Sequence, residues 1–187
     1  MPPIHVSDRD LRDGAVRACR DDETGTMLTI INTAAEAYRG VIPTDCWHEP
    51  YMPALELAAE IEAGVTFTGY EVDGVLAGVM GMQPVRNVDL IRHAYVLPEF
   101  QGRGVGSALL ESLCARSERQ VLVGTWAAAT WAIGFYERHG FHLVSGTTKP
   151  LLLRTYWSIS QRQIETSVVL AAPALSHDAA LTLVSNS

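Results

Sequence analysis

The chain has 187 residues, of which 48% are hydrophobic and 19% charged, a balance that predicts a single globular domain with a substantial core. Its formal net charge of −7 argues against a general nucleic-acid binder, because such proteins need a basic face to displace counterions. No apolar run reaches the length of a membrane span, so we expect no membrane partner.

The number and spacing of the cysteines indicate a reducing compartment. Cys19, Cys46 and Cys114 are widely separated and odd in number, without metal-ligand spacing. They argue against a disulfide framework or a zinc site, and predict reduced packing residues in a cytoplasmic protein with no metal. The first 13 residues carry aspartates in place of a basic segment, so we expect no signal peptide.

The first half of the chain predicts helices followed by a strand meander. Residues 1–13 predict an N-terminal arm ahead of a domain over residues 14–170. Helical spacing of Met27, Ile31 and Ala34 marks the first helix, and Asp73-Gly74 is a strong hairpin turn. The expected elements are a strand at 14–19, a helix from 21 or 22 to 38, a loop at 41–51, a helix from 53 to 63, and strands at 65–72, 75–82 and 89–96.

The second half starts with a glycine-rich turn and a helix. Strand 120–126, helix 129–139, a strand starting at 141–145 and, after a long connection, a last strand at 164–170 are expected to follow. Residues 171–187 predict a loose C-terminal tail. This order predicts an α+β fold with a mostly antiparallel sheet.

The glycine-rich turn, Gly102-x-Gly104-x-Gly106, predicts a phosphate site. Glycine allows close approach of the backbone, and the first N–H groups of the following helix have no partner within the helix. The segment lacks the lysine of a P-loop. It also lacks the spacing and the downstream acid of a dinucleotide-binding turn.

Two motifs carry a family resemblance. Residues 101–106 resemble the Q/R-x-x-G-x-G/A acetyl-CoA signature of the GNAT superfamily of N-acyltransferases, and residues 132–141 resemble its second signature, A-x-x-F-Y-E-x-x-G-F. The resemblance covers roughly residues 15–170. It implies a GNAT fold, with a mixed, mostly antiparallel central sheet of six to seven strands and about four helices. In that sheet the glycine-loop strand and the next strand splay apart to admit the pantetheine arm of acetyl-CoA.

The resemblance also implies which residues bind acetyl-CoA. Backbone N–H groups of the loop would hold the pyrophosphate, with the Arg103 side chain as a further phosphate contact, and Val96 would pair with the pantetheine arm through its backbone. Ala129 stands where the family usually has an asparagine, so one contact is missing. The expected set is Val96, Gln101, Gly102, Arg103, Gly104, Val105, Gly106, Ser107, Ala132 and Phe135.

Two residues are predicted to be catalytic. Tyr136 matches the family tyrosine that donates a proton to the coenzyme A thiolate. Strand 89–96 lacks the glutamate that several members use as general base, and His93 is its best substitute. We expect Arg92 and His93 on opposite faces, although a bulge would exchange them. Weaker candidates for the base are a water chain, Asp89, His48 and Glu49.

The acceptor pocket is predicted at the segment before the second helix. Trp47, His48, Glu49 and Tyr51 lie there, and Trp126 ends a strand near the splay. An aromatic box with one acid suits a cationic amine or an amino-acid amine.

The expected function is acetyl-CoA-dependent N-acetylation of a primary amine of a small molecule or amino acid, by direct transfer in a ternary complex. The alternatives are acetylation of a protein N-terminus or lysine, and a non-catalytic module that senses acyl-CoA. A homodimer through the last strand and its neighbours is compatible with the fold.

Overall fold

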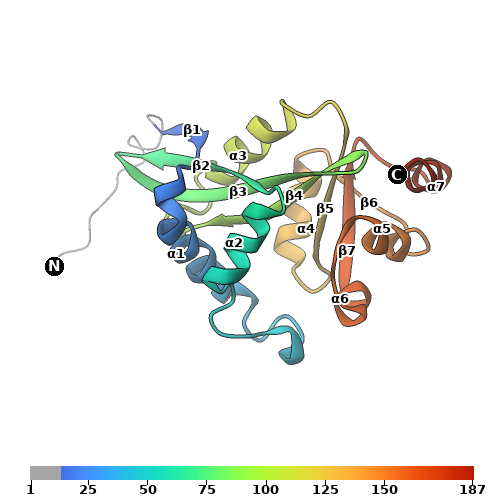
Figure 1. The fold of residues 1–187 in the computed structure, drawn as a ribbon, viewed down its shortest axis with the longest axis horizontal. Helices are drawn as coiled ribbons and strands as arrows, with labels where there is room; N and C mark the ends of the chain where they lie inside the picture. Colours follow the sequence, from blue (N-terminus) through green and yellow to red (C-terminus); the bar gives the residue numbers. More distant parts are fainter. Residues whose placement is uncertain (1–13) are drawn as a thin grey trace.

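A computed structural model describes residues 14–187, and the predicted N-terminal arm lies outside this range. One seven-stranded sheet, ordered β1-β2-β3-β4-β5-β7-β6, forms the centre of the domain (Figure 1). All neighbours are antiparallel except β4 and β5, so the mixed, mostly antiparallel sheet is confirmed. The strands are β1 Ala15–Ala18, β2 Thr66–Val72, β3 Val75–Val85, β4 Val88–Val96, β5 Gln120–Trp126, β6 His142–Leu143 and β7 Ser167–Ala172.

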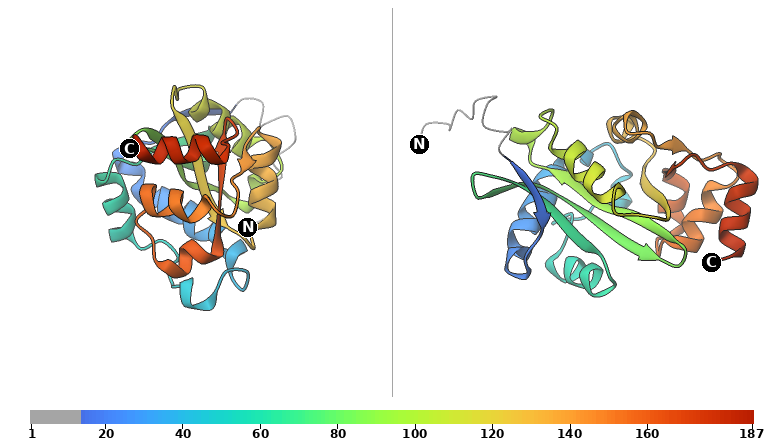
Figure 2. Two further views of the ribbon diagram at one scale, coloured as in Figure 1. Left: turned by 90° about the vertical axis from the view of Figure 1, so that its right-hand side faces the viewer. Right: turned by 90° about the horizontal axis from the view of Figure 1, so that it is seen from above.

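Helices cover both faces of the sheet. Helices α1 and α2 pack on one face, and α3 lies on the opposite face (Figure 1). Two views place α5, α6 and α7 at the end of the molecule that carries β7 and β6 (Figures 1 and 2). The helices are α1 Thr24–Ala35, α2 Ala54–Glu62, α3 Val105–Cys114, α4 Thr130–Arg138, α5 Lys149–Tyr156, α6 Gln161–Thr166 and α7 His177–Ser185.

The β2–β3 hairpin forms where Asp73-Gly74 predicts it. Asp73 has φ +50° and Gly74 has φ +77°. Two positive φ angles define the two-residue turn whose twist matches that of antiparallel strands. The strand after it runs to Val85 instead of Met82, and Arg86, with φ +53°, makes the next turn.

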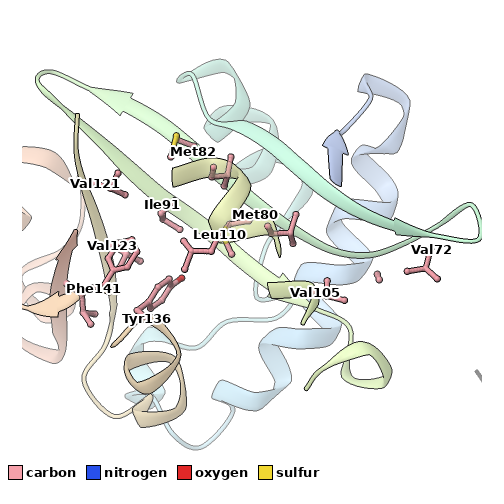
Figure 3. Packing of buried hydrophobic residues seen from close by; sticks show 14 residues of the cluster. Val72, Met80, Met82, Ile91, Val105, Leu110, Val121, Val123, Tyr136 and Phe141 are labelled. Atoms are coloured by element: carbon pink, nitrogen blue, oxygen red, sulfur yellow. The ribbon is translucent and has the colours of Figure 1, made fainter. Parts of the chain in front are cut away.

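The strands β4 and β5 separate at one end. Their parallel pairing covers Val88–Ile91 and Gln120–Val123, whereas β4 continues to Val96 and β5 to Trp126. The two strands therefore diverge beyond Ile91, as the family resemblance implies. Figure 3 shows Ile91 and Val123 near this point, with the ring of Tyr136 beside them.

The C-terminal third differs from the prediction. Residues 164–166 belong to helix α6, and β7 begins at Ser167. Ser160 and Gln163 form a capping box at the start of α6, a local signal that favours a helix here. The long connection also contains α5, and the predicted loose tail contains α7, whose Ala180 is fully buried. The described residues thus hold seven α-helices, against about four expected.

A partly buried ion-pair network attaches β1 to the rest of the domain. Arg17 on β1 donates to both carboxylate oxygens of Glu23, at 2.8 and 2.7 Å, and also to Glu71 on β2. The hydrogen bonds from Arg17 lower the pKa of Glu23 to about 2, although burial opposes this shift. The Glu23 side chain is only 10% exposed, so solvent screens the pair weakly.

We expect Glu23→Gln to lower the free energy of unfolding by about 2 kcal/mol at pH 7. Because folding lowers the pKa of Glu23, the carboxylate stabilises the protein fully above its unfolded pKa, and this contribution is lost as pH falls towards about 2. Urea unfolding at pH 7 and pH 3 measures the difference between variant and wild type. A difference that stays constant across these pH values would contradict the assignment.

Candidate active site

The glycine turn adopts the conformation that its sequence predicts. Gly102 has φ +71° and Gly104 has φ +89°, a left-handed region that residues with a Cβ rarely adopt. Gly104 precedes α3, and its carbonyl accepts the first helical bond, from the N–H of Ala108. The N–H groups of the first turn of α3 therefore have no acceptor within the helix. A Cβ on Gly102 or Gly104 would meet nothing within 4 Å, so open space lies beside the loop.

Neighbouring groups hold this turn in place. The Gln101 side chain donates to the Val96 carbonyl at 2.9 Å and joins the loop to the end of β4. Phe135 of α4 packs on Gly106, where a Cβ would lie 3.4 Å from the ring. The small residue at position 106 thus allows α4 to approach the start of α3 closely.

A histidine that the sequence analysis did not select connects the same two helices. His139 Nδ1 lies 2.8 Å from the Phe135 carbonyl, which can only accept, so this nitrogen carries the hydrogen. Nε2 lies 2.9 Å from the Ser107 hydroxyl and, in a neutral ring, accepts its proton. Ser107 therefore offers a ligand chiefly its backbone N–H.

One cavity of about 760 Å³ occupies the region where β4 and β5 diverge. It extends from the glycine turn and the face of α4 to the segments before α2 and after α5. The members of the expected cofactor set that line it are Val96, Gln101, Gly102, Gly106, Ala132 and Phe135. Arg103, Gly104, Val105 and Ser107 are not among the lining residues.

We expect Gly104→Ala to weaken coenzyme A binding by more than tenfold, because a Cβ at φ +89° strains the turn by about 1 kcal/mol or more and displaces its N–H groups. Gly64→Ala is the matched control, since Gly64 has φ +98°, open surroundings and a position at the end of α2. Titration calorimetry with coenzyme A measures the effect. Equal affinity of the two variants would contradict a role of the turn in binding.

The charged side chain on the cavity wall differs from the predicted one. Both side chains are exposed, but Arg138 of α4 lines the cavity and Arg103 does not. The sequence does contain a signal for Arg138. This residue follows Phe135 by three residues on α4, so both side chains lie on one face of the helix. A guanidinium there is suited to a phosphate oxygen.

We expect Arg138→Ala to raise the dissociation constant of coenzyme A about tenfold, since a charge-assisted hydrogen bond contributes about 1.5–3 kcal/mol before solvent screening. Arg103→Ala is expected to change it less than about twofold, as is usual for a solvated charge. The dissociation constants should converge at high salt, because salt screens the lost charge. A larger effect at Arg103 would reverse the assignment.

Tyr136 lies on the buried side of α4. It is 5% exposed, packs against Phe141 with ring centroids 5.6 Å apart, and borders the cavity. Burial raises the pKa of its phenol well above the ordinary value, so the hydroxyl is protonated at neutral pH. No described residue accepts a hydrogen bond from this hydroxyl at bonding distance.

A β-bulge places the predicted base. One residue of β3, Met80, faces both His93 and Ala94, and His93 has φ +50°. The expectation that Arg92 and His93 face opposite sides is wrong, because both side chains reach Glu60 of α2. His93 also stacks on Phe67 and lines the cavity.

Glu60 supplies a carboxylate that the strand itself lacks. Its Oε2 lies 2.7 Å from Arg92 Nη2 and 3.4 Å from His93 Nε2. Burial raises the pKa of Glu60, but its interactions with His93 and Arg92 outweigh burial and lower it overall. The sequence analysis missed Glu60, which is 33 residues from His93 and appears there only as one polar position of a helix.

The predicted acceptor residues divide into two groups. Tyr51 and Trp126 line the cavity, and Trp126 Nε1 lies 3.5 Å from the Tyr51 hydroxyl. Trp47, His48 and Glu49 do not line it. Glu49 pairs with Arg39 at 2.9 Å and its side chain is 70% exposed.

Asp89, another candidate for the base, accepts a hydrogen bond from Ser117 near the end of α3, at 2.7 Å, and does not line the cavity. It is buried at the paired end of β4, where β4 and β5 still form a ladder. Its carboxylate therefore serves to connect β4 with the segment after α3.

The described residues contain no group of three or more His, Cys, Asp or Glu side chains arranged to hold a metal ion. No helix in the described part of the chain is long and apolar enough to cross a membrane. The glycine turn, the free N–H groups of α3, Arg138 and the open end between β4 and β5 fit a phosphorylated ligand with an extended arm.

Comparison with known proteins agrees with this geometry. Residues 63–143 match the model of the acetyltransferase (GNAT) domain. No curated protein sequence matches the chain significantly.

Three solved structures illustrate the shared fold. PaiA N-acetyltransferase from Thermoplasma acidophilum in complex with coenzyme A is 16% identical, with a TM-score of 0.63 over 85% of this chain and 98% of that one. The ribosomal-protein-S18-alanine N-acetyltransferase from Escherichia coli is 18% identical, with a TM-score of 0.61 over 88% and 97%. YncA from Salmonella typhimurium, a putative acetyltransferase solved with acetyl-CoA, is 20% identical, with a TM-score of 0.56 over 71% and 82%.

The domain match covers the glycine turn, α3, β5 and α4, and the solved structures share the arrangement of elements around them. Residues 63–143 therefore resemble a GNAT acetyltransferase domain, and the fold is that of the solved N-acetyltransferases.

Proposed function

We propose that this chain transfers an acetyl group from acetyl-CoA to a primary amine of a small molecule, by direct attack within a ternary complex. The observation that carries the proposal is a single cavity that joins the glycine turn to Tyr136 and His93. Bound acetyl-CoA supplies an acyl group activated as a thioester.

Three groups of residues would have separate roles in binding and catalysis. The N–H groups at the start of α3, with Arg138, would hold the phosphates. His93 would remove a proton from the attacking amine, held by its bulge and by Glu60. As the new C–N bond forms and the C–S bond breaks, the Tyr136 hydroxyl would give its proton to the departing sulfur.

A cytoplasmic location suits the three free cysteines, Cys19, Cys46 and Cys114, because reducing conditions keep thiols unpaired. A homodimer remains a prediction from the family resemblance. Among the solved structures of the same fold, one is named for a protein N-terminal alanine as substrate, so a protein acceptor is the alternative.

The first test is release of coenzyme A from acetyl-CoA, followed by detection of the free thiol, across amines, amino acids, polyamines and peptides. Turnover above the background without acceptor would support acetyltransferase activity. The class of acceptor with the highest turnover would show whether the substrate is a small amine or a protein N-terminus. Tight acetyl-CoA binding, measured by calorimetry, with no turnover on any acceptor would overturn catalysis and favour a module that senses acyl-CoA.

A further inference from the structure

Aromatic side chains form part of the cavity wall. Tyr38 and Tyr51 stack with their centroids 6.1 Å apart and an interplanar angle of 12°. Tyr95 meets both rings edge-on, at 6.4 Å from each centroid. Trp126 and Trp157 line the cavity from the β5 side, and the Trp157 indole lies against Gly124, 3.4 Å from where a Cβ would be. These rings come from five separate segments and form one chamber, the aromatic chamber.

The aromatic chamber carries no negative charge. Among the described residues that line the cavity, none is aspartate or glutamate. The nearby acids lie outside the lining: Glu49 pairs with Arg39 and Asp45 with Arg162, whereas Glu60 pairs with Arg92 and lies behind His93.

The tyrosine hydroxyls add no charge either. Burial raises the pKa of Tyr38 to about 12 and places that of Tyr95 well above its ordinary value. Both phenols are neutral at pH 7. Among the described residues that line the cavity, the arginines are Arg92, which Glu60 neutralises, and Arg138, which would repel a second ammonium group.

We propose that the acceptor is a primary amine joined by a short aliphatic link to an aromatic ring, of the arylalkylamine type. The ring would stack in the aromatic chamber, because aromatic pairs favour offset-stacked and edge-on arrangements. The amine would then lie near His93, which lines the same cavity. This inference rests on the proposed function, and it removes Glu49 from the expected acceptor site, because Glu49 does not line the cavity.

A polyamine fits this chamber poorly. Each further ammonium group would lose its hydration without gaining a carboxylate partner. A straight alkylamine would fill the volume without stacking. An arylalkylamine, an alkylamine and a polyamine are therefore expected to be acetylated with different efficiencies, and a panel with one amine of each type tests this.

The test compares phenethylamine, n-hexylamine and spermidine with the purified full chain, as kcat/KM for coenzyme A release. We expect phenethylamine to exceed n-hexylamine by about tenfold and spermidine by about 100-fold, since the ring adds stacking and the polyamine adds unpaired charge. Spermidine or n-hexylamine equal to or better than phenethylamine would overturn the inference and leave the proposed function standing.

A binding measurement separates the two proposals if no turnover occurs. Calorimetry in the presence of coenzyme A reports phenethylamine binding without chemistry. Phenethylamine binding at least about tenfold tighter than spermidine would support the aromatic chamber even if catalysis failed. Equal or absent binding of both amines would overturn the inference.

Tyr51→Leu provides the matched variant, because leucine keeps an apolar side chain and removes the ring. We expect the preference for phenethylamine over n-hexylamine to fall about tenfold. His48→Leu is the control: His48 stacks on Tyr51 but does not line the cavity, so the preference should stay within about twofold of wild type. An unchanged preference in Tyr51→Leu would contradict stacking in the aromatic chamber.

Discussion

Replacing His93 with asparagine is expected to lower kcat about 100-fold or more at pH 7, the range in which a positioned general base contributes. His93 lines the cavity in a bulge at φ +50°, and asparagine tolerates this left-handed region better than most residues. The variant therefore removes the basic nitrogen while the backbone and a polar partner for Glu60 remain. Free-thiol detection with saturating acetyl-CoA measures kcat, and calorimetry checks that coenzyme A still binds.

His48→Asn is the control for this experiment, since His48 is exposed and lies outside the cavity wall. We expect it to retain kcat within about twofold, as surface substitutions usually do. If His93→Asn keeps the wild-type kcat, the proton leaves by another route, and a chain of water molecules becomes the leading explanation.

Tyr136→Phe is expected to lower kcat about 100-fold while coenzyme A binding and thermal stability stay close to wild type. The phenol is buried and protonated at neutral pH, as a proton donor to a departing thiolate requires. Because no described residue accepts its hydrogen bond, loss of the hydroxyl leaves no protein partner unpaired. Single-turnover coenzyme A release measures the chemical step directly.

Tyr156→Phe is the matched control for the same chemical change. The Tyr156 hydroxyl donates to Asn87 Oδ1 at 2.8 Å, and Tyr156 does not line the cavity. We expect this variant to lose about 1 kcal/mol of unfolding free energy and to keep its turnover. Turnover retained in Tyr136→Phe would assign the proton to another donor.

Local sequence was sufficient for the parts of the site that depend on short-range geometry. Gly102 and Gly104 are needed where the backbone takes positive φ before a helix, and Asp73-Gly74 specifies its hairpin for the same reason. The spacing of residues 132–141 placed Phe135 and Tyr136 on one helix directed at the cavity. Such signals span a few residues, so they can be read from the sequence alone.

Short helices at the C-terminal end could not be recognised in the same way. Helices α5, α6 and α7 have 8, 6 and 9 residues. Helices of this length are marginal by themselves and derive their stability from packing, here against Leu122, Val169 and Ala171 of the sheet.

The tertiary structure alone decided which side chains meet. A bulge turned His93 towards Glu60, helix α4 brought Arg138 rather than Arg103 to the cavity, and the chain fold gathered the aromatic chamber from five segments. Contacts between residues far apart in sequence depend on how the sheet faces are covered, and strand or helix periodicity does not encode them. The sequence alone therefore identifies the glycine turn and the helix that carries Tyr136. The contact between His93, the proposed base, and Glu60, and the set of residues in the proposed acceptor chamber, follow only from packing.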